Sequence, residues 1–306
     1  MTQISDQVRA ACARVAGSAR SVRIETSAIP AYAAEIERAG PPTTPGRAVG
    51  ADREQRVAFV ICLDAINFGS GWWPTIRKRE GLSGYSTIEA GLVERFRGEG
   101  AWTAGELTQL GAVDLASVTG QDVGHPLMEQ YAAALRDVGD RVLADHGGSF
   151  ESVVEAAGGS ALVLADLLAD WDAFADVSEY EGEPIPFFKR AQIAAADVGR
   201  MGAAELRDVE RLTAFADNLV PHVLRVDGVL RLDSELERRI DAEELLEHGS
   251  PEEVELRACA VQAIELLVDA LDRRRSPAQV DAALWNRGRA PSYKSRPRPR
   301  SRNTAY

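Results

Sequence analysis

Residues 251–275 carry the clearest helical pattern in the sequence, and they set the expectation for the whole chain. Ser250 can cap this helix, Pro251 suits its first turn, and Glu253 completes a capping box. Apolar residues then recur every three or four positions, which is typical of a helix with one buried face. This stripe comprises Val254, Ala258, Val261, Ile264, Val268 and Leu271. The arginines at 273–275 follow at the C-terminal end, where the helix dipole favours positive charge.

Similar spacing recurs along most of the chain. It predicts helices at 53–66, 86–98, 104–111, 125–145, 149–176, 187–200, 203–217 and 277–286. Residues 1–39 are also predicted to be helical, with a break at Ile29-Pro30, and a loop rich in proline and glycine follows at 40–52. Strand signals are scarce, apart from a short candidate at 228–232. The sequence therefore predicts a mainly α protein, a single compact multi-helix domain with few or no strands.

Charge is distributed unevenly along the chain. The net charge is −12, yet residues 273–306 hold ten lysines and arginines and a single acidic residue, Asp281. An acidic body argues against a general nucleic-acid binder. The body suits a cationic ligand and the basic end suits a phosphate. Charge alone favours a simpler alternative, a solvated acidic surface with a disordered basic tail.

Targeting signals are missing from the sequence. Residues 1–25 have no apolar core of a signal peptide, and no run of about 18 apolar residues could span a membrane. The three cysteines, Cys12, Cys62 and Cys259, lie far apart and suit free thiols in a reducing compartment. We therefore expect a cytoplasmic protein with no membrane association.

Most kinds of reactive site are excluded by the motifs that are missing. No glycine-rich loop follows a strand, and no histidine has a second histidine or cysteine at metal-ligand spacing. We therefore expect neither a metal nor a cofactor. Carboxylates and lysines remain as the reactive groups.

Four polar residues interrupt apolar helical runs. Lys189 follows Phe187 and Phe188, and Asp197 lies two turns further along, so the two could share a face. Asp64 and Asn67 have the i, i+3 spacing that places both on one side of a helix. Each of these residues has two interpretations. It can line a pocket, or it can have a structural role in which it faces water, caps a helix or extends its polar end to the surface.

The segment at 213–222 combines an aromatic ring with a carboxylate. Phe215 precedes Asp217 by two positions, at the predicted end of a helix and just before Pro221. The ring could stack on a nucleobase while the carboxylate lies beside the bond from the base to its sugar. This pair favours an enzyme that cleaves that bond.

Several segments resemble the queuosine salvage proteins, a family of queuosine 5′-phosphate N-glycosylases/hydrolases. They are Leu63–Phe68 with Gly84-Tyr85, Phe188–Ile193 with Ala196-Asp197, Phe215–Asp217 through Pro221 to Leu224-Arg225, and Leu284–Gly288 through Tyr293–Pro297 to Arg302 and Tyr306. Residues 248–257 also look similar to the family. The resemblance implies a fold related to the helical, helix-hairpin-helix type DNA glycosylases. It implies a variable N-terminal segment at 1–52 and a helical catalytic domain at 53–306, which ends in the basic segment 273–306.

The resemblance also implies an activity, the release of queuine, a 7-deazaguanine base, from queuosine 5′-monophosphate. Phe215 would stack on the base, and Asp217 would stabilise or attack the positively charged sugar that forms as the bond breaks. Asp281 and Trp285 would contact the base. Further candidates for this pocket are Lys189 and Asp197 for catalysis and Asp64, Asn67 and Tyr85 for substrate binding. The candidate cations for the 5′-phosphate are Lys189, Lys294, Arg296 and Arg298.

Two other functions remain open at this stage. One is a helical glycosylase that acts on a base within a nucleic acid, which the acidic body disfavours. The other is a protein that binds queuine without cleaving any bond. For the enzyme we expect a monomer that handles a small-molecule substrate and has no stable nucleic-acid partner. Lys189 could also pair with Asp197 and fix its protonation state.

Overall fold

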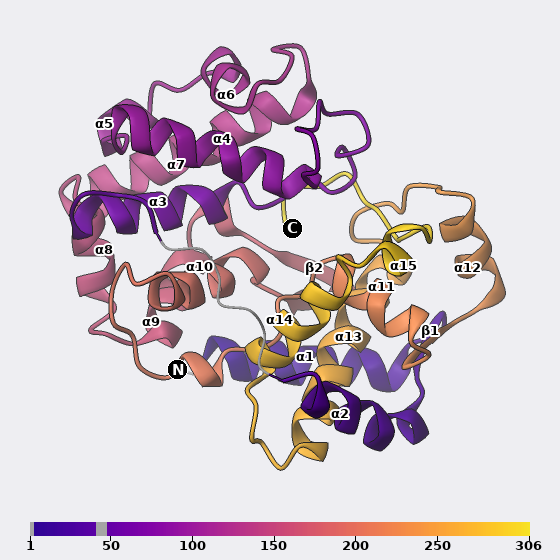
Figure 1. Cartoon of the computed structure of the whole chain (residues 1–306). Helices are drawn as coiled ribbons and strands as arrows, with labels where there is room; N and C mark the ends of the chain where they lie inside the picture. The colour runs from indigo at the N-terminus through magenta and orange to yellow at the C-terminus, as the bar shows by residue number, and fades with distance from the viewer. Residues whose placement is uncertain (1–2, 41–47) are drawn as a thin grey trace.

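The computed structural model describes residues 3–40 and 48–306, and α-helices dominate it (Figure 1). The predicted mainly α class is confirmed. The loop predicted at 40–52 lies partly outside the described residues. No helix in the described ranges is long and apolar enough to cross a membrane.

One group of helices surrounds a first hydrophobic core, and most of it lies in the upper left of Figure 1. It contains α3 (Arg53–Ala65), α4 (Gly84–Glu99), α5 (Ala104–Leu107), α6 (Ala112–Thr119), α7 (Pro126–His146), α8 (Phe150–Ala156), α9 (Ala161–Ala169) and α10 (Lys189–Arg200). Nine consecutive residues of α3, Val57 to Ala65, are buried. Because α3 is buried on every side there, its polar Asp64 must find its partners inside the protein.

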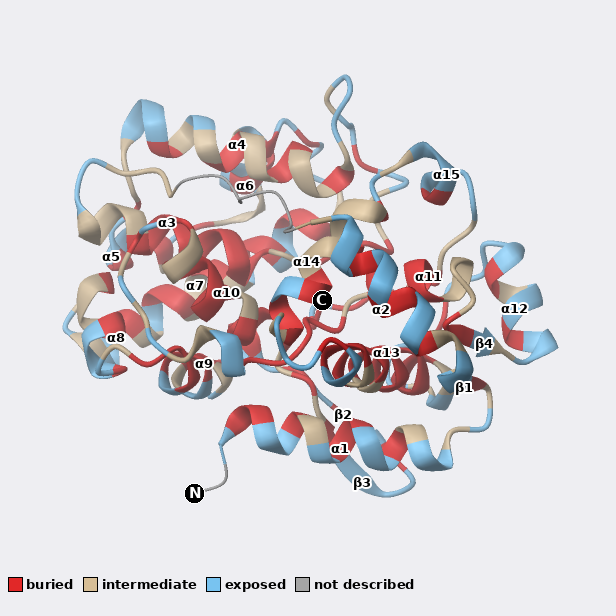
Figure 2. Cartoon of the chain, turned by 60° about the horizontal axis from the view of Figure 1, so that its bottom comes forward, coloured by how far each residue is buried: buried red, intermediate tan, exposed pale blue. Residues whose placement is uncertain are grey.

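A second group surrounds another core, in the lower and right parts of Figure 1. It contains α1 (Ile4–Ser18), α2 (Ile29–Arg38), α11 (Leu219–Val226), α12 (Ser234–Asp241), α13 (Pro251–Ala270), α14 (Pro277–Arg287) and α15 (Pro291–Lys294). Figure 2 shows α13 buried along most of its length, whereas α1 buries one face and exposes the other. Helix α13 is therefore the centre of this group.

Two small antiparallel sheets complete the described structure. Strand β1 (Val22–Ile24) pairs with β4 (Leu230–Leu232), and β2 (Val177–Tyr180) forms a hairpin with β3 (Glu183–Pro186). Strand β4 falls within the predicted segment 228–232. Short 3₁₀ turns lie at Thr26–Ala28, Asp172–Phe174 and Val209–Arg211.

Several predicted helix boundaries are wrong, each for a local reason. The helix expected at 149–176 is divided, because Gly158 and Gly159 adopt left-handed backbone angles (φ 57° and 75°) between α8 and α9. The break expected at Ile29-Pro30 falls earlier, since Pro30 lies in the first turn of α2. The helix expected at 251–275 begins as predicted, with Ser250 as its cap, but ends at Ala270.

The helix expected at 203–217 does not form. Near its end, two backbone N–H groups bond to side chains instead of to the carbonyl four residues earlier. Thr213 donates its N–H to Oε1 of Gln192 (3.0 Å), and Phe215 donates its N–H to Oδ1 of Asp281 (3.0 Å). The segment around Phe215 is therefore held by side chains of α10 and α14, and its residues pack in both hydrophobic cores.

Candidate active site

A cavity of about 660 Å³ lies between the two helix groups. Residues from α4 and α10 line one side, and residues from the 215–219 segment, α14 and the C-terminal segment line the other. The predicted site residues that line it are Asn67, Tyr85, Lys189, Asp197, Phe215, Asp217, Asp281, Trp285 and Lys294. Asp64 lies just behind Asn67, while Arg296 is exposed and outside the lining.

Asp217 lies two residues before the start of α11, which begins at Leu219. Its Oδ1 accepts the backbone N–H groups of Leu219 (2.8 Å) and Val220 (3.0 Å), so the carboxylate caps the first turn of this helix. Among the described residues, none donates to Oδ2. The sequence placed Asp217 at the end of a helix before a proline break. That expectation is wrong, because Pro221 lies inside the first turn of α11, where its missing N–H is tolerated.

Asp281 on α14 is buried close to this segment, with only 5% of its surface exposed. Burial, together with the nearby charge of Asp217, raises the pKa of its carboxyl to about 8, although the hydrogen bond from Phe215 lowers it. The cavity therefore holds one carboxyl group that keeps its proton at neutral pH when the site is empty.

Lys189 begins α10 and is almost fully buried. Its ammonium Nζ donates to the backbone carbonyl of Asn67 (3.0 Å), and its N–H donates to Oδ2 of Asp176 (2.9 Å). Burial lowers the pKa of Lys189, and the charges of Asp217 and Asp64 oppose that effect. The ammonium is thus held in the cavity wall, within electrostatic reach of Asp217.

Two further carboxyl groups occupy the wall beside Lys189. Oδ1 of Asp64 accepts a hydrogen bond from Asn67 (3.1 Å), while its buried Oδ2 has no hydrogen-bond partner among the described residues. Burial and the nearby Asp197 raise the pKa of Asp64 well above its usual range. Asp197 does not bond directly to Lys189, the pairing left open by the sequence; its partner is Arg200, whose Nε donates to Oδ1 (2.8 Å). Burial nevertheless raises the pKa of Asp197.

Aromatic rings from α4 and α14 line a further part of the cavity. The sequence predicted only some of the residues there. Tyr85 and Trp285 meet edge to face with 6.3 Å between ring centroids, and the guanidinium of Arg289 lies 5.0 Å from the Trp285 ring. Glu89 also lines this part of the cavity, and burial together with Asp197 raises its pKa. Glu89 follows Tyr85 by one helical turn on α4, a spacing that could have indicated it.

The basic C-terminal segment is not a disordered tail. Asn218 donates to the carbonyl of Pro299 (2.9 Å), Arg225 donates to that of Pro297 (3.0 Å), and Leu246 donates its N–H to that of Arg300 (2.8 Å). These bonds bring Arg298 and Arg300 to the cavity rim, beside the more exposed Lys294. Burial and the neighbouring Arg300 lower the pKa of Arg298. A concentrated positive charge therefore faces the acidic interior.

No group of His, Cys, Asp and Glu side chains within residues 3–40 and 48–306 is arranged to hold a metal ion. The chemical groups that the cavity offers are therefore carboxyls, several of them with raised pKa values, the buried ammonium of Lys189, aromatic rings and rim arginines. This combination can bind a flat ring that carries a cationic substituent, next to an anionic group. It can also place a carboxylate against a carbon atom that becomes positively charged.

A family model and several individual proteins that are similar to this chain carry matching descriptions. The family model described as queuosine salvage protein matches residues 48–306. A queuosine 5′-phosphate N-glycosylase/hydrolase of Sphaerobacter thermophilus is 33% identical over 308 residues, which cover 96% of this chain and 95% of that protein. Proteins with the same name from Dictyostelium discoideum (27% identical, 83% of this chain, 79% of that protein) and Nematostella vectensis (29%, 72% and 68%) are also similar.

Proposed function

The chain belongs to the queuosine salvage protein family, and we propose that it hydrolyses the N-glycosidic bond of queuosine 5′-phosphate to release queuine. The observation that carries this proposal is the position of Asp217. Its Oδ1 is fixed by the start of α11, while its Oδ2 remains available in the cavity that Phe215 and Asp281 also line.

Asp217 acts on the sugar. As the bond between C1′ and the base breaks, its electron pair stays with the base and positive charge develops on the sugar. A carboxylate beside C1′ stabilises that charge or attacks the carbon. Water supplies a hydroxyl to C1′ and a proton to the base, so the reaction needs no cofactor. The buried ammonium of Lys189 lies within electrostatic reach of the Asp217 carboxylate.

The base lies against Phe215, Asp281 and Trp285. The Phe215 ring stacks on it, and Asp281 accepts hydrogen bonds from the adjacent N–H groups of its guanine-like edge. Queuine also carries an amine on its cyclopentenediol arm, and the acidic wall formed by Glu89 and Asp197 suits that positive charge. A 7-deaza base lacks the ring nitrogen N7 that other hydrolases can protonate, so positioning contributes a larger share of the rate.

The 5′-phosphate lies at the rim with Arg298, Arg300 and Lys294. Arg296, which the sequence also suggested for this role, is exposed and lies outside the lining. We propose that the substrate is a free nucleotide and that the enzyme is a cytoplasmic monomer. The net charge of −12 disfavours a stable complex with nucleic acid, whose binding depends on phosphate contacts.

The experiment that tests this proposal is incubation of the protein with queuosine 5′-monophosphate, with queuine measured by chromatography and mass spectrometry. We expect queuine to appear in proportion to protein and time. If none appears above a control without protein, the proposal is wrong. A parallel incubation with tRNA that contains queuosine distinguishes a glycosylase acting within nucleic acid. Tight binding of queuine without turnover would indicate the non-catalytic alternative.

A further inference from the structure

Arg257 lies beneath the cavity and outside its lining, yet it contacts both segments that carry the proposed catalytic groups. It belongs to α13, and its side chain is 2% exposed. Its Nε donates to the backbone carbonyl of Ala216 (3.0 Å), the residue immediately before Asp217. Its two terminal nitrogens donate to the two oxygens of the fully buried Asp176 (2.9 and 2.7 Å). One guanidinium therefore uses all three of its nitrogens in fixed directions.

Asp176 connects Arg257 to the backbone of Lys189 by hydrogen bonds. Its Oδ2 accepts the N–H of Lys189, and its backbone carbonyl accepts the N–H groups of Phe187 (2.9 Å) and Phe188 (3.2 Å). Phe188 has a left-handed backbone (φ 48°), which a bulky residue rarely adopts. Such a conformation persists where surrounding contacts enforce it, and it is found mainly at functional sites. The bonds to Asp176 enforce it here and set the direction in which α10 begins.

Two aromatic rings fix the plane of the guanidinium. Its central carbon lies 3.9 Å from the centroid of the Phe187 ring and 4.3 Å from that of Tyr306. Tyr306 belongs to the C-terminal segment that brings Arg298 to the rim. The same arginine therefore joins the segment of Asp217, the start of α10 and the segment of the rim cations.

We propose that Arg257 is a positioning residue that holds the Asp217 carboxylate and the Lys189 ammonium in register. It binds the backbone next to one group and, through Asp176, the backbone of the other. This inference rests on the proposed function. A small displacement of either group would reduce the rate of bond cleavage, because catalysis by a fixed charge depends steeply on geometry.

The test compares Arg257→Lys and Arg257→Ala with the unmodified protein in turnover of queuosine 5′-monophosphate and in binding of queuine. Lysine keeps the charge but cannot donate to Ala216 and to both oxygens of Asp176 together. We expect kcat to fall by at least about tenfold in Arg257→Lys and further in Arg257→Ala. The Kd for queuine should stay within about threefold, since Phe215 and Asp281 remain in contact with each other. Guanidinium ions at low millimolar concentration should restore part of the kcat of Arg257→Ala, and sodium ions should not.

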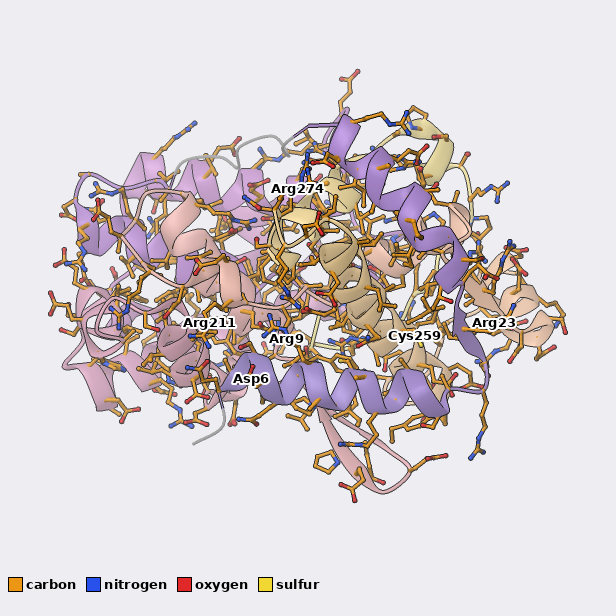
Figure 3. The ribbon with its side chains drawn as sticks, turned by 90° about the horizontal axis from the view of Figure 1, so that it is seen from below. Asp6, Arg9, Arg23, Arg211, Cys259 and Arg274 are labelled. Atoms are coloured by element: carbon orange, nitrogen blue, oxygen red, sulfur yellow. The ribbon has the colours of Figure 1, made fainter. Side chains whose placement is uncertain are left out.

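Arg9 provides the matched control. It also pairs with a carboxylate, Glu265 (2.9 Å), and donates to a backbone carbonyl, that of Arg211 (2.8 Å), on the underside of the molecule (Figure 3). It lies outside the cavity lining. Arg9→Ala should lower the melting temperature and leave kcat unchanged.

Three results would overturn the inference while the unmodified protein still releases queuine. They are an unchanged kcat in Arg257→Lys, an equal loss of kcat in Arg9→Ala, and failure of both Arg257 variants to fold while Arg9→Ala folds. The last result would assign Arg257 to the fold alone. Absence of turnover in the unmodified protein would instead contradict the proposed function.

Discussion

The backbone N–H of Phe215 donates a hydrogen bond of 3.0 Å to Oδ1 of Asp281, across 66 positions in the sequence. The two residues proposed to hold the base, one by stacking and one by hydrogen bonding, are thus directly connected. The bond also draws the 213–217 segment out of a helical path and towards α14. The proposed catalytic carboxylate of Asp217 follows two residues later, so its position depends on the same contact.

The first prediction concerns Asp217→Asn. The amide keeps an oxygen that can cap α11, so the fold and the binding of queuine should be preserved. Turnover should fall at least about a hundredfold, because the developing cation loses its counter-charge. Single-turnover assays would measure this. Near-normal turnover would move the catalytic role to another carboxyl group, with Asp197 as the first to examine.

A second prediction concerns the ring of Phe215. Phe215→Leu keeps an apolar side chain at this buried position but removes the flat face on which a base can stack. The Kd for queuine should rise roughly tenfold, and kcat at saturating substrate should change much less. Calorimetry with queuine would measure the affinity. Unchanged affinity in Phe215→Leu would contradict the stacking role.

The sequence allowed prediction of the helical class and of most lining residues because both depend on local pattern. Periodic apolar residues indicated the helices that later bury those faces. Polar residues such as Asp64 and Lys189 stood out because they interrupt apolar runs, where burial requires a partner. Pattern could not resolve the segment around Phe215, since its hydrogen bonds go to side chains on distant helices.

The pairing of Asp176 with Arg257 was missed for the same reason. Asp176 and Arg257 are separated by 81 positions, and nothing in either local sequence indicates that they meet. For the C-terminal segment the sequence left two interpretations open, a disordered tail from charge alone and phosphate-binding cations from the resemblance. Its composition suggests a solvated tail, whereas contacts with Asn218, Arg225 and Leu246 hold it against the body. Composition reports charge, but contacts between distant residues decide whether a segment folds.

The third prediction separates two neighbouring arginines of that segment. Arg298 lines the cavity and Arg296 does not. Arg298→Ala should raise KM for queuosine 5′-monophosphate by at least about tenfold, since a charge-assisted hydrogen bond contributes about 1.5–3 kcal/mol. Arg296→Ala, the control, should change KM by less than about twofold because an exposed charge is screened. The ratio of KM values for nucleotide and nucleoside measures the effect. Equal effects of both substitutions would reject a phosphate site at Arg298.

The last prediction concerns the protonation of Asp281. Burial raises the pKa of this carboxyl to about 8 in the empty cavity, so it is mostly protonated at pH 7. Accepting hydrogen bonds from the base favours the ionised form and lowers the pKa in the complex. Binding below pH 8 must therefore release a proton. The affinity for queuine should increase as pH rises from 6 to 8, by at most about tenfold per pH unit, and should level off above that range.

Calorimetry in two buffers with different heats of ionisation would count the released protons. We expect up to about one proton at pH 7 in the unmodified protein and fewer in Asp281→Asn, whose affinity should depend less on pH. The carboxyls of Glu89 and Asp197, whose pKa values burial also raises, are unchanged in that variant. The difference between the two proteins therefore isolates Asp281. Affinity that instead increases as pH falls would show that the protonated Asp281 carboxyl donates a hydrogen bond to the base. Its role would then be that of a donor and not of an acceptor.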